Sequence, residues 1–369
     1  MPSANANAII LHSNALHNKK TKGELSISVS LNPGGTVGNI ALSGALLQTA
    51  PVIGTKLSAS VRDAANQRYT LPHPTRMELI RSLDSPAANL SVSFPVERRS
   101  ENILDVSLNA DNNNLFDGKI DEQGFTVSQG GRLLTLEARD RGGAPLDNEA
   151  MPQTLWGANA ATMFSRLLRQ HGFELHNTMP ARILPVFTIY KGMSEWDAFA
   201  AFVTQMHGIA PHVEGRLVVV GRPRPGTRMV FSNTKQNCIP FTTLTHRRVP
   251  YRMISRVIMR DADGWYSSAY TNTAASFHGV SRTRYVIPPT EFIDNPGLDA
   301  KLRINRAQYR SDEVVIRCPG LLFMYPGQQC AVEDSSFSQQ NVHVDKIRHI
   351  VSDAGMFTEL NLCQWLYYS

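Results

Sequence analysis

Apolar and polar residues alternate along much of this chain, in short runs that end at Gly, Pro, Asn or Asp. In Leu25–Leu31 every second residue is Leu, Ile or Val, which predicts a strand with one buried face. The turn residues Gln129-Gly130-Gly131 separate two further runs and predict a hairpin. Strands of this kind are predicted at Lys56–Val61, Leu90–Phe94, Leu115–Phe116, Phe125–Val127 and Leu133–Ala138, with other turns at Asp117-Gly118 and Gly142-Gly143. The first part of the chain is therefore expected to be β-strands joined by tight turns.

Residues 151–221 have a helical period in two places. Apolar residues recur at helical spacing within Ala158–Gln170 and again within Ser194–Met206. Ser194 followed three residues later by Asp197 resembles a capping box and predicts a helix start. Gly172 and Gly208 follow these segments, where a helix C-terminus favours a left-handed residue. Strand-like residues lie at Phe173–Leu175, Ile183–Tyr190 and Leu217–Val220. The pattern predicts a small α+β unit built from two related helix–strand modules.

Residues 222–369 return to the strand pattern after the linker Arg222–Gly226. A helix is expected at about residues 296–310, because Asn295-Pro296 precedes apolar residues on one side and Pro is tolerated in a first turn. The predicted strands are Arg228–Phe231, Met253–Met259, Trp265–Tyr270, Thr283–Ile287, Val314–Cys318, Gln329–Val332, Val342–Val351 and Phe357–Cys363. The last four could close a small barrel.

Length and composition favour several globular domains. The chain has 369 residues, of which 42% are hydrophobic and 18% charged, with a net charge of +6. Two to four domains are the fair expectation for this length. The N-terminus lacks the basic and apolar regions of a signal peptide, and no apolar stretch is long enough to span a bilayer. Four separated cysteines give no zinc-ligand spacing, and Cys318 and Cys363 are expected to be buried thiols.

A series of segments resembles a known family. A strand leads into F-x-G-x-I-D-E at Phe116–Glu122, then a hairpin, then a strand that ends in A-R-D-R and a loop L-D-N-E-A. Ser82–Phe94, P-G-Q-Q-C-A-V-E-D and D-A-G-M-F-T-E-L-N-L continue the series. In this order they resemble the central hub protein of contractile phage-tail baseplates, the late control protein D family. The family is related to the hub part of type VI secretion spikes.

The resemblance implies a mainly β fold with an α+β insertion. It places an N-terminal arm at residues 1–24, a first tube-like β-barrel at 25–150 and a peripheral α+β domain at 151–221. A second tube-like barrel at 222–369 carries the helical insertion. Hub proteins are trimers, and two barrels in each of three chains make a pseudo-hexameric ring.

The resemblance also implies the partners and the location. The trimer would join the hexameric tail tube to the trimeric central spike, contact baseplate wedge components, and leave an axial channel for DNA or tape-measure protein. The protein would be made in the bacterial cytoplasm and would end in a phage baseplate or a phage-tail-like particle. No catalytic residue, metal or cofactor is expected. The sequence does not separate a phage from a bacteriocin particle, or show what residues 1–24 do.

Three groups of residues could carry chemistry in principle. Asp121, Glu122, Glu137 and Asp140 could form a carboxylate pair for glycoside hydrolysis, although surface carboxylates on turns and strands are the more common case. Asp147-Asn148-Glu149 could bind a cation or form an ordered loop held by Asx-type hydrogen bonds. His171 and His207 each precede a helix-ending Gly, where an imidazole can bond the last carbonyls.

Arginine recurs at every fourth position from Arg248 to Arg260. If Met253–Met259 is a strand, Arg252, Arg256 and Arg260 share one face, because side chains alternate with period two. That face could line a lumen or contact a neighbouring subunit, or it could be an ordinary solvated face.

Two functions of other classes stay open. One is a tail-tip peptidoglycan hydrolase that uses the acidic residues between Asp121 and Asp140. The other is a carbohydrate-binding adhesin, suggested by the aromatic residues Trp265, Tyr266 and Tyr270.

Overall fold

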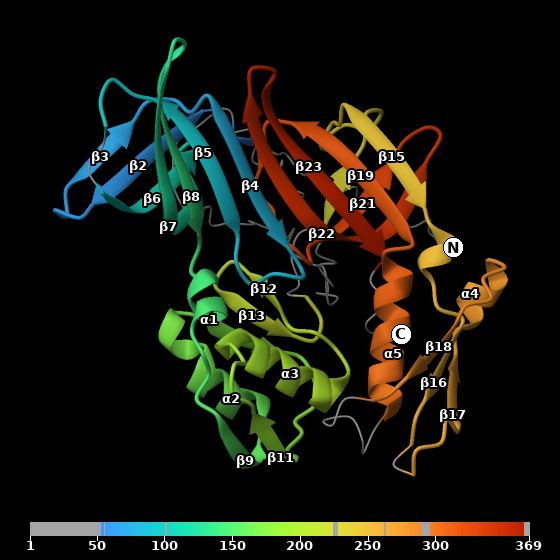
Figure 1. Cartoon of the computed structure of the whole chain (residues 1–369). Coiled ribbons are helices and arrows are strands. Elements are labelled where there is room, and N and C mark those ends of the chain that lie inside the picture. Colours follow the sequence, from blue (N-terminus) through green and yellow to red (C-terminus); the bar gives the residue numbers. More distant parts are fainter. Residues whose placement is uncertain are drawn as a thin grey trace, which may run out of the picture. The chain divides into compact units, whose positions relative to one another are not determined.

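The computed structural model describes residues 53–54, 56–99, 102–223, 228–261, 263–288 and 296–364 (Figure 1). The predicted arm of residues 1–24 and the predicted strand Leu25–Leu31 lie outside these ranges. So does most of the predicted linker Arg222–Gly226.

A single sheet of 13 strands runs through most of the described chain. The strands along its path are, in spatial order, β15 (Thr243–Arg248), β19 (Asp312–Pro319), β23 (Gly355–Gln364), β22 (Ser338–Ser352), β4 (Arg76–Ser82), β5 (Asn89–Pro95), β8 (Gly131–Arg139), β7 (Asn113–Ser128), β6 (Ile103–Ala110), β2 (Leu57–Asp63) and β3 (Arg68–Leu71). Two further strands, β21 (Gln329–Glu333) and β14 (Met229–Phe231), branch from β22. Another pair joins β1 (Ile53–Gly54) to β20 (Leu321–Leu322).

The two halves of the sheet meet where β4 pairs with β22. Leu79 lies opposite His349, and Met77 lies opposite Val351. All four side chains are buried. Since opposite residues of an antiparallel pair point to the same face, the cores of both halves lie on one face of the sheet.

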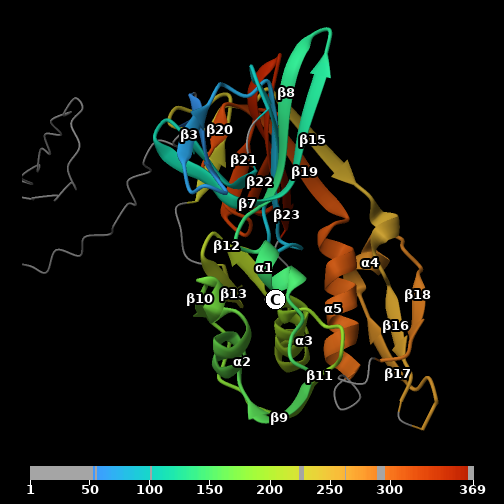
Figure 2. The same cartoon turned by 60° about the vertical axis from the view of Figure 1, so that its left-hand side comes forward.

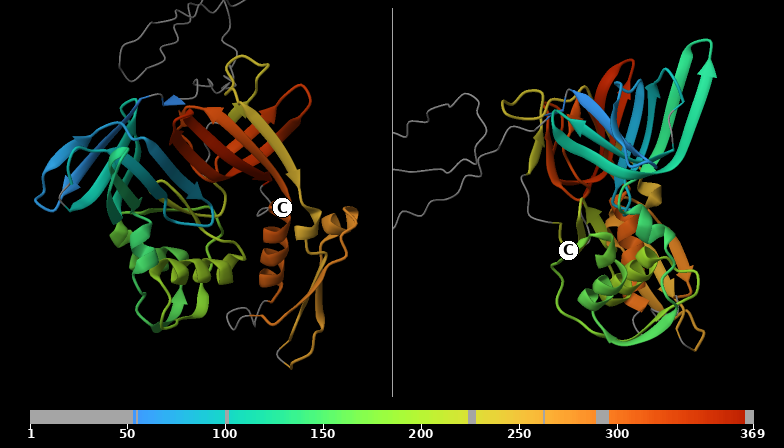
Figure 3. Two further views of the ribbon diagram at one scale, coloured as in Figure 1. Left: turned by 45° about the horizontal axis from the view of Figure 1, so that its top comes forward. Right: turned by 90° about the vertical axis from the view of Figure 1, so that its left-hand side faces the viewer.

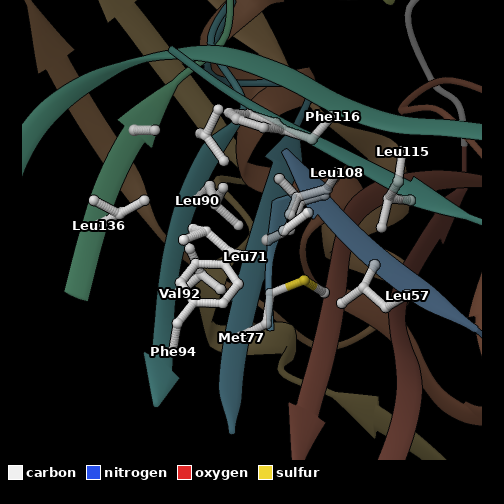
Figure 4. Packing of buried hydrophobic residues seen from close by; sticks show 14 of the residues in the cluster. Leu57, Leu71, Met77, Leu90, Val92, Phe94, Leu108, Leu115, Phe116 and Leu136 are labelled. Atoms are coloured by element: carbon white, nitrogen blue, oxygen red, sulfur yellow. The ribbon is translucent and has the colours of Figure 1, made fainter. Parts of the chain in front are cut away.

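The first core is formed by alternate residues of β2 and β4 to β8 (Figure 4). Met77, Leu90, Phe94, Leu108 and Leu136 are at most 1% exposed. The second core contains Phe231, Ile316, Val344, Ile347 and Leu360 among its buried members, from β14, β19, β22 and β23. The alternation that predicted strands from sequence is therefore the alternation that fills each core.

The α+β unit contains two helices and two small sheets. The helices are α2 (Ala160–Leu167), extended by the 3-10 turn η1 (Arg169–His171), and α3 (Glu195–His207). One sheet has the order β10 (Glu174–Asn177), β13 (Leu217–Val220) and β12 (His212–Glu214), and the other pairs β11 (Leu184–Ile189) with β9 (Gln153–Ala158). The predicted cap is confirmed, because the Ser194 hydroxyl accepts a hydrogen bond from the Asp197 amide at 3.0 Å. The predicted stop is confirmed as well, because Gly208 is left-handed with φ 67°.

An insertion follows the edge strand β15. It contains η2 (Pro250–Arg252), β16 (Arg256–Met259), β17 (Ser268–Thr271), α4 (Thr273–Phe277), β18 (Thr283–Val286) and α5 (Pro296–Tyr309). β16 lies between β17 and β18, and Val257 and Met259 pack against Ala300 and Ile304 of α5. α5 also contacts α3, so it lies between α3 and the three-stranded sheet (Figure 3).

The structure differs from the sequence-based prediction at the first hairpin. The predicted turn at Asp117-Gly118 is wrong, because β7 runs unbroken from Asn113 to Ser128. A Cβ on Gly118 would lie 2.4 Å from the Phe116 ring and 2.6 Å from the Arg139 carbonyl oxygen, so this glycine permits close packing within a strand. The predicted loop after Gly142 instead forms the short helix α1 (Gly143–Asp147).

Candidate assembly surfaces

The second face of the sheet is mainly polar across both halves, with Ile80, Leu133, Val315 and Ile350 among its apolar residues. From β15 to β7, eight strands lie side by side (Figure 1), and every neighbouring pair is antiparallel. The residues that alternate with the buried ones form what we call the polar face. Its polar members include Glu78, Ser91, Ser93, Glu122, Thr135, Glu137, Arg247, Glu313, Arg317, Lys346, Arg348, Glu359 and Asn361.

Charges of both signs are interleaved on the polar face. Arg348 lies 2.6 Å from Glu78 and 3.7 Å from Glu359, so it links β22 to a neighbour on each side. The hydrogen bond and charge of Arg348 lower the pKa of Glu78 from its usual value. Ser91 of β5 donates to Glu137 of β8 at 2.7 Å. The polar face is therefore readily hydrated, and it does not strongly attract either anions or cations.

The eight-stranded segment has one free edge and a second edge that is free in part. β15 pairs with β19 on one side, and no described residue pairs with its other edge. β7 pairs with β6 only as far as Lys119, and the outer edge of Gly124–Ser128 has no backbone partner within the described ranges. Figure 2 shows β7 and β8 extending as a hairpin past their neighbours. Free strand edges of this kind are a template for pairing with another chain.

The arginine stripe does not form one strand face. Arg252 lies in η2, and Arg256 begins β16. Arg260 follows the end of β16 and donates to the Gly264 carbonyl at 3.1 Å. The prediction of one continuous strand through these arginines is wrong, since η2 separates Arg252 from β16. None of the three belongs to the eight-stranded segment, and their assignment to a lumen or a subunit interface stays a prediction.

The acidic residues of the first hairpin are held in structural pairs. Arg139 contacts Asp121 at 2.7 Å and Asp147 at 2.7 Å, using both carboxylate oxygens of each. This arginine lowers the pKa of Asp147, the opposite of what a general acid requires. Burial raises the pKa of Asp140, whose side chain accepts backbone N–H bonds from Ala88 and Gly142. Asp140 therefore connects the turn before Ala88 to the turn at Gly142 through these two hydrogen bonds.

We expect no peptidoglycan hydrolysis from these carboxylates. Digests of purified cell wall with the wild-type protein should release no muropeptides above the level of Glu122→Gln and Glu137→Gln. The reason is that Asp121 is neutralised by Arg139 and Glu137 accepts a bond from Ser91. Release by the wild-type protein that either substitution abolishes would restore the hydrolase alternative.

The loop Asp147-Asn148-Glu149 is ordered, but not by Asx-type bonds. Glu149 accepts from Lys191 at 2.7 Å and from the Gly192 amide at 2.9 Å, while Asp147 pairs with Arg139. These partners occupy the oxygens that a cation would need. Within the described ranges no group of three or more His, Cys, Asp and Glu residues could hold a metal ion.

The histidines that precede helix-ending glycines do not bond carbonyl oxygens. His171 contacts Glu195 at 2.6 Å. The His207 ring nitrogens have no hydrogen-bond partner among the described residues. The predicted carbonyl bonds are therefore wrong for both rings. Cys318 and Cys363 are buried as predicted, and burial raises the pKa of the Cys318 thiol to about 12.

Comparison with known proteins rests on structure alone. No family profile matches the sequence, and no curated protein matches it. The structure is similar to a tail protein from Neisseria meningitidis, with a TM-score of 0.64 and 19% identity over 84% of this chain and 96% of the other. The 43 kDa tail protein of prophage MuSo2 from Shewanella oneidensis gives a TM-score of 0.67 and 11% identity, over 84% and 98% of the two chains.

A third similar structure comes from a secretion system. The E. coli c3393 protein is a component of the type VI secretion system and is described as structurally similar to T4 bacteriophage tail proteins. It aligns with a TM-score of 0.53 and 8% identity over 84% of this chain and 77% of its own. This chain has a phage baseplate hub-like fold.

The hub-like fold confirms the predicted fold class, mainly β with a small α+β part. Sequence reasoning missed β4 and β6, although both show period-two alternation in Arg76–Ser82 and Ile103–Ala110. It also missed the free edges, because an edge is defined by which strands fail to pair. No helix within the described ranges is both long and apolar enough to cross a membrane.

Proposed function

We propose that this protein is a structural component of a phage tail or phage-tail-like baseplate, a trimeric hub that joins the hexameric tail tube to the trimeric central spike. The observation that carries the proposal is the single sheet that spans two separate cores and has one polar face. Each half then offers one tube-like unit, and three chains offer six. The role is mechanical, and no catalytic site is assigned.

The strand directions favour a closed ring. Because seven antiparallel pairings connect β15 to β7, these two edge strands run in opposite directions. Rotation of one chain onto the next can then place β15 of one copy beside β7 of its neighbour and continue the antiparallel pattern. A repeated heterologous contact of this kind closes into a ring and covers both of these edges.

The polar face would line the channel of such a ring. Both cores lie on the opposite face of the sheet, so the polar face is the surface that remains to meet solvent or a passing polymer. Its interleaved Glu78, Arg348 and Glu359 give no broad positive field. DNA or tape-measure protein could pass such a wall without tight electrostatic binding.

The remaining parts would occupy the periphery. We assign residues 25–150 and 222–369 to the two tube-like units, residues 151–221 to a peripheral α+β domain, and residues 1–24 to an arm. Exposed Tyr285, which contacts Tyr266 edge-on at 5.4 Å, lies on the insertion near Arg256. This insertion, with Arg252, Arg256 and Arg260, is a candidate contact for a neighbouring subunit or a wedge component. The spike would sit at the other end of the channel from the tube.

Two measurements test the hub assignment. Mass measurement of the purified protein should give three copies per particle. Cryo-microscopy of purified tails should place the chain on the tail axis between tube and spike. A monomer at all concentrations, together with a position away from the axis, would contradict the proposal.

Charge reversal at the free edges should weaken the trimer. Arg247 is exposed on β15, and Glu122 is exposed on β7 between the part that pairs with β6 and the free part Gly124–Ser128. We expect Arg247→Glu or Glu122→Lys alone to raise the trimer dissociation constant about tenfold or more, because each places like charges together. The double variant should recover part of the loss.

The control for this experiment is Lys346→Glu, which changes a charge on the same face but in an interior strand. Sedimentation velocity over a range of concentrations reports the dissociation constant. Equal effects of all three single variants, with no recovery in the double variant, would argue against contact between these edges.

A further inference from the structure

A groove separates the first turn of α2 from the last turn of α3 in the α+β unit. Its volume is about 520 Å³, within the range of small-ligand sites. The residues that line it are Asn159, Ala160, Ala161, Asn177, Pro180, Ala181, Arg182, Ile183, Met206 and His207. None of them is acidic, and Arg182 carries the only fixed charge in the lining. None of the lining residues belongs to the polar face, so the hub assignment does not explain this groove.

The polar groups of this groove are arranged as donors. The Asn159 side-chain oxygen accepts from the Thr162 amide at 2.9 Å, and the Asn177 oxygen accepts from the Met179 amide at 2.9 Å. Both oxygens are therefore engaged, which leaves the two NH₂ groups as donors. The N-terminus of α2 adds backbone N–H groups and the positive end of the helix dipole.

Arg182 extends the positive potential along the groove. One guanidinium nitrogen donates to the Met206 carbonyl at 3.3 Å, which places Arg182 over the end of α3. The side chain is otherwise exposed, so further N–H donors can face a ligand. Donors and a cation with no nearby carboxylate favour an anion.

His207 is the second, independent sign of a ligand. This residue is 8% exposed, and neither ring nitrogen has a hydrogen-bond partner among the described residues. An imidazole buried without partners costs free energy that a bound group can recover. Burial, and then the charge of Arg182, lower its pKa to about 4, so the ring is neutral at pH 7 and keeps one N–H donor.

The residues in the walls of the groove indicate which kind of molecule presents the anionic group. Pro180 and Ile183 are exposed on one side, and Met206 lies on the other. Apolar walls around a few donors suit a short stretch of polypeptide with an apolar residue next to its charge. We propose that this groove binds a carboxylate presented by a polypeptide segment, as an acidic side chain or as a chain terminus, with Arg182, His207 and the N-terminus of α2 as its donors.

Three short peptides test the proposal on the full-length protein by isothermal titration calorimetry. Acetyl-Leu-Glu-amide presents a side-chain carboxylate, and acetyl-Leu-Leu with a free terminus presents a terminal one. Acetyl-Leu-Gln-amide is the uncharged control peptide of the same size as the Glu peptide. We expect at least one carboxylate peptide to bind about tenfold or more tightly than the Gln peptide, and the stronger of the two identifies the source.

Variants locate the binding and exclude a general charge effect. Arg182→Gln should lower the affinity for the carboxylate peptide about tenfold. Arg169 is an exposed arginine outside the groove, so Arg169→Gln should leave this affinity unchanged. The His207 ring signals in NMR should shift on addition of the peptide in the wild-type protein. Unchanged melting temperatures of both variants show that the fold is retained.

Three outcomes would overturn the inference. The first is equal binding of the Glu and Gln peptides. The second is equal loss of affinity in Arg182→Gln and Arg169→Gln. The third is binding of inorganic phosphate as tightly as any peptide, which would remove the polypeptide from the proposal. None of these outcomes bears on trimer formation, so the groove and the hub role fail or hold separately.

Discussion

Acidification from pH 7.5 to pH 5 is expected to lower the free energy of unfolding by about 2 kcal/mol through His349 alone. This residue is fully buried, and its Nε2 lies 2.8 Å from the Leu322 carbonyl oxygen, to which it donates. Burial, and then the charge of Arg81, lower the pKa of His349 to about 3. The loss matters because single domains are stable by only about 5–15 kcal/mol.

The direction of this pH effect follows from the pKa of His349 in the folded protein and in the unfolded chain. The ordinary histidine pKa of 6.5 applies to the unfolded chain, so that chain binds the proton first as pH falls. The stabilisation is complete above about pH 6.5 and is lost progressively as pH falls toward 3. Burial also lowers the pKa values of His207 and His343, both to about 4, so all three histidines act in the same direction.

Urea unfolding followed by far-ultraviolet circular dichroism at several pH values measures this effect. In His349→Gln the amide can still donate to Leu322, but the titrating group is gone. The variant should therefore lose stability less steeply between pH 6.5 and pH 5 than the wild-type protein. Parallel pH profiles of the two proteins would show that His349 does not carry the effect.

Gly142→Ala should destabilise the protein by about 3 kcal/mol, the upper end of the cost of overpacking. A Cβ at this position would lie 2.1 Å from the Pro86 carbonyl oxygen and 2.7 Å from the Ala87 Cα. Both are backbone atoms, so no side-chain rotation relieves the clash. Asp140 holds the two segments together through the Ala88 and Gly142 amides, so neither can move away without losing a hydrogen bond.

Gly124→Ala is the matched control for Gly142→Ala. This glycine is also in the first half of the sheet, but the nearest atom to an added Cβ is 3.8 Å away. We expect a change within about 0.5 kcal/mol, as for most surface substitutions. Thermal melts of both variants compare the two positions directly. A Gly142→Ala melt that matches that of Gly124→Ala would mean that the turn at Pro86 adapts freely.

The features that sequence predicted well depend on neighbours within a few residues. Ser194 and Gly208 bound α3 as expected, because a cap and a left-handed stop are decided within one turn. The last four strands of the second half are predicted closely, because period-two burial is visible in short runs such as Asp312–Pro319, but the edge strand β15 is not predicted. The turn at Gly118 was placed wrongly because glycine has the same local appearance in a turn and in a crowded strand.

The candidate surfaces cannot be predicted from residues that are close in the sequence. The sequence shows Arg139 only as the end of a predicted strand, whereas in the structure it bridges Asp121 and Asp147 across two elements. The arginine stripe looked continuous because spacing alone does not reveal the break at η2. His207 was expected to bond a carbonyl, and its unpartnered ring becomes visible only when Arg182 and the groove are in place.

The sequence by itself determined the local elements, the mainly β class and, through the order of its turn motifs, the resemblance to hub proteins. Tertiary structure decided that the two β-rich halves share one sheet, since β4 pairs with β22 and Arg348 meets Glu78 from 270 residues away. Such pairing depends on which strand edges remain free after each core has formed. That is a property of the whole fold, and no window of the sequence contains it.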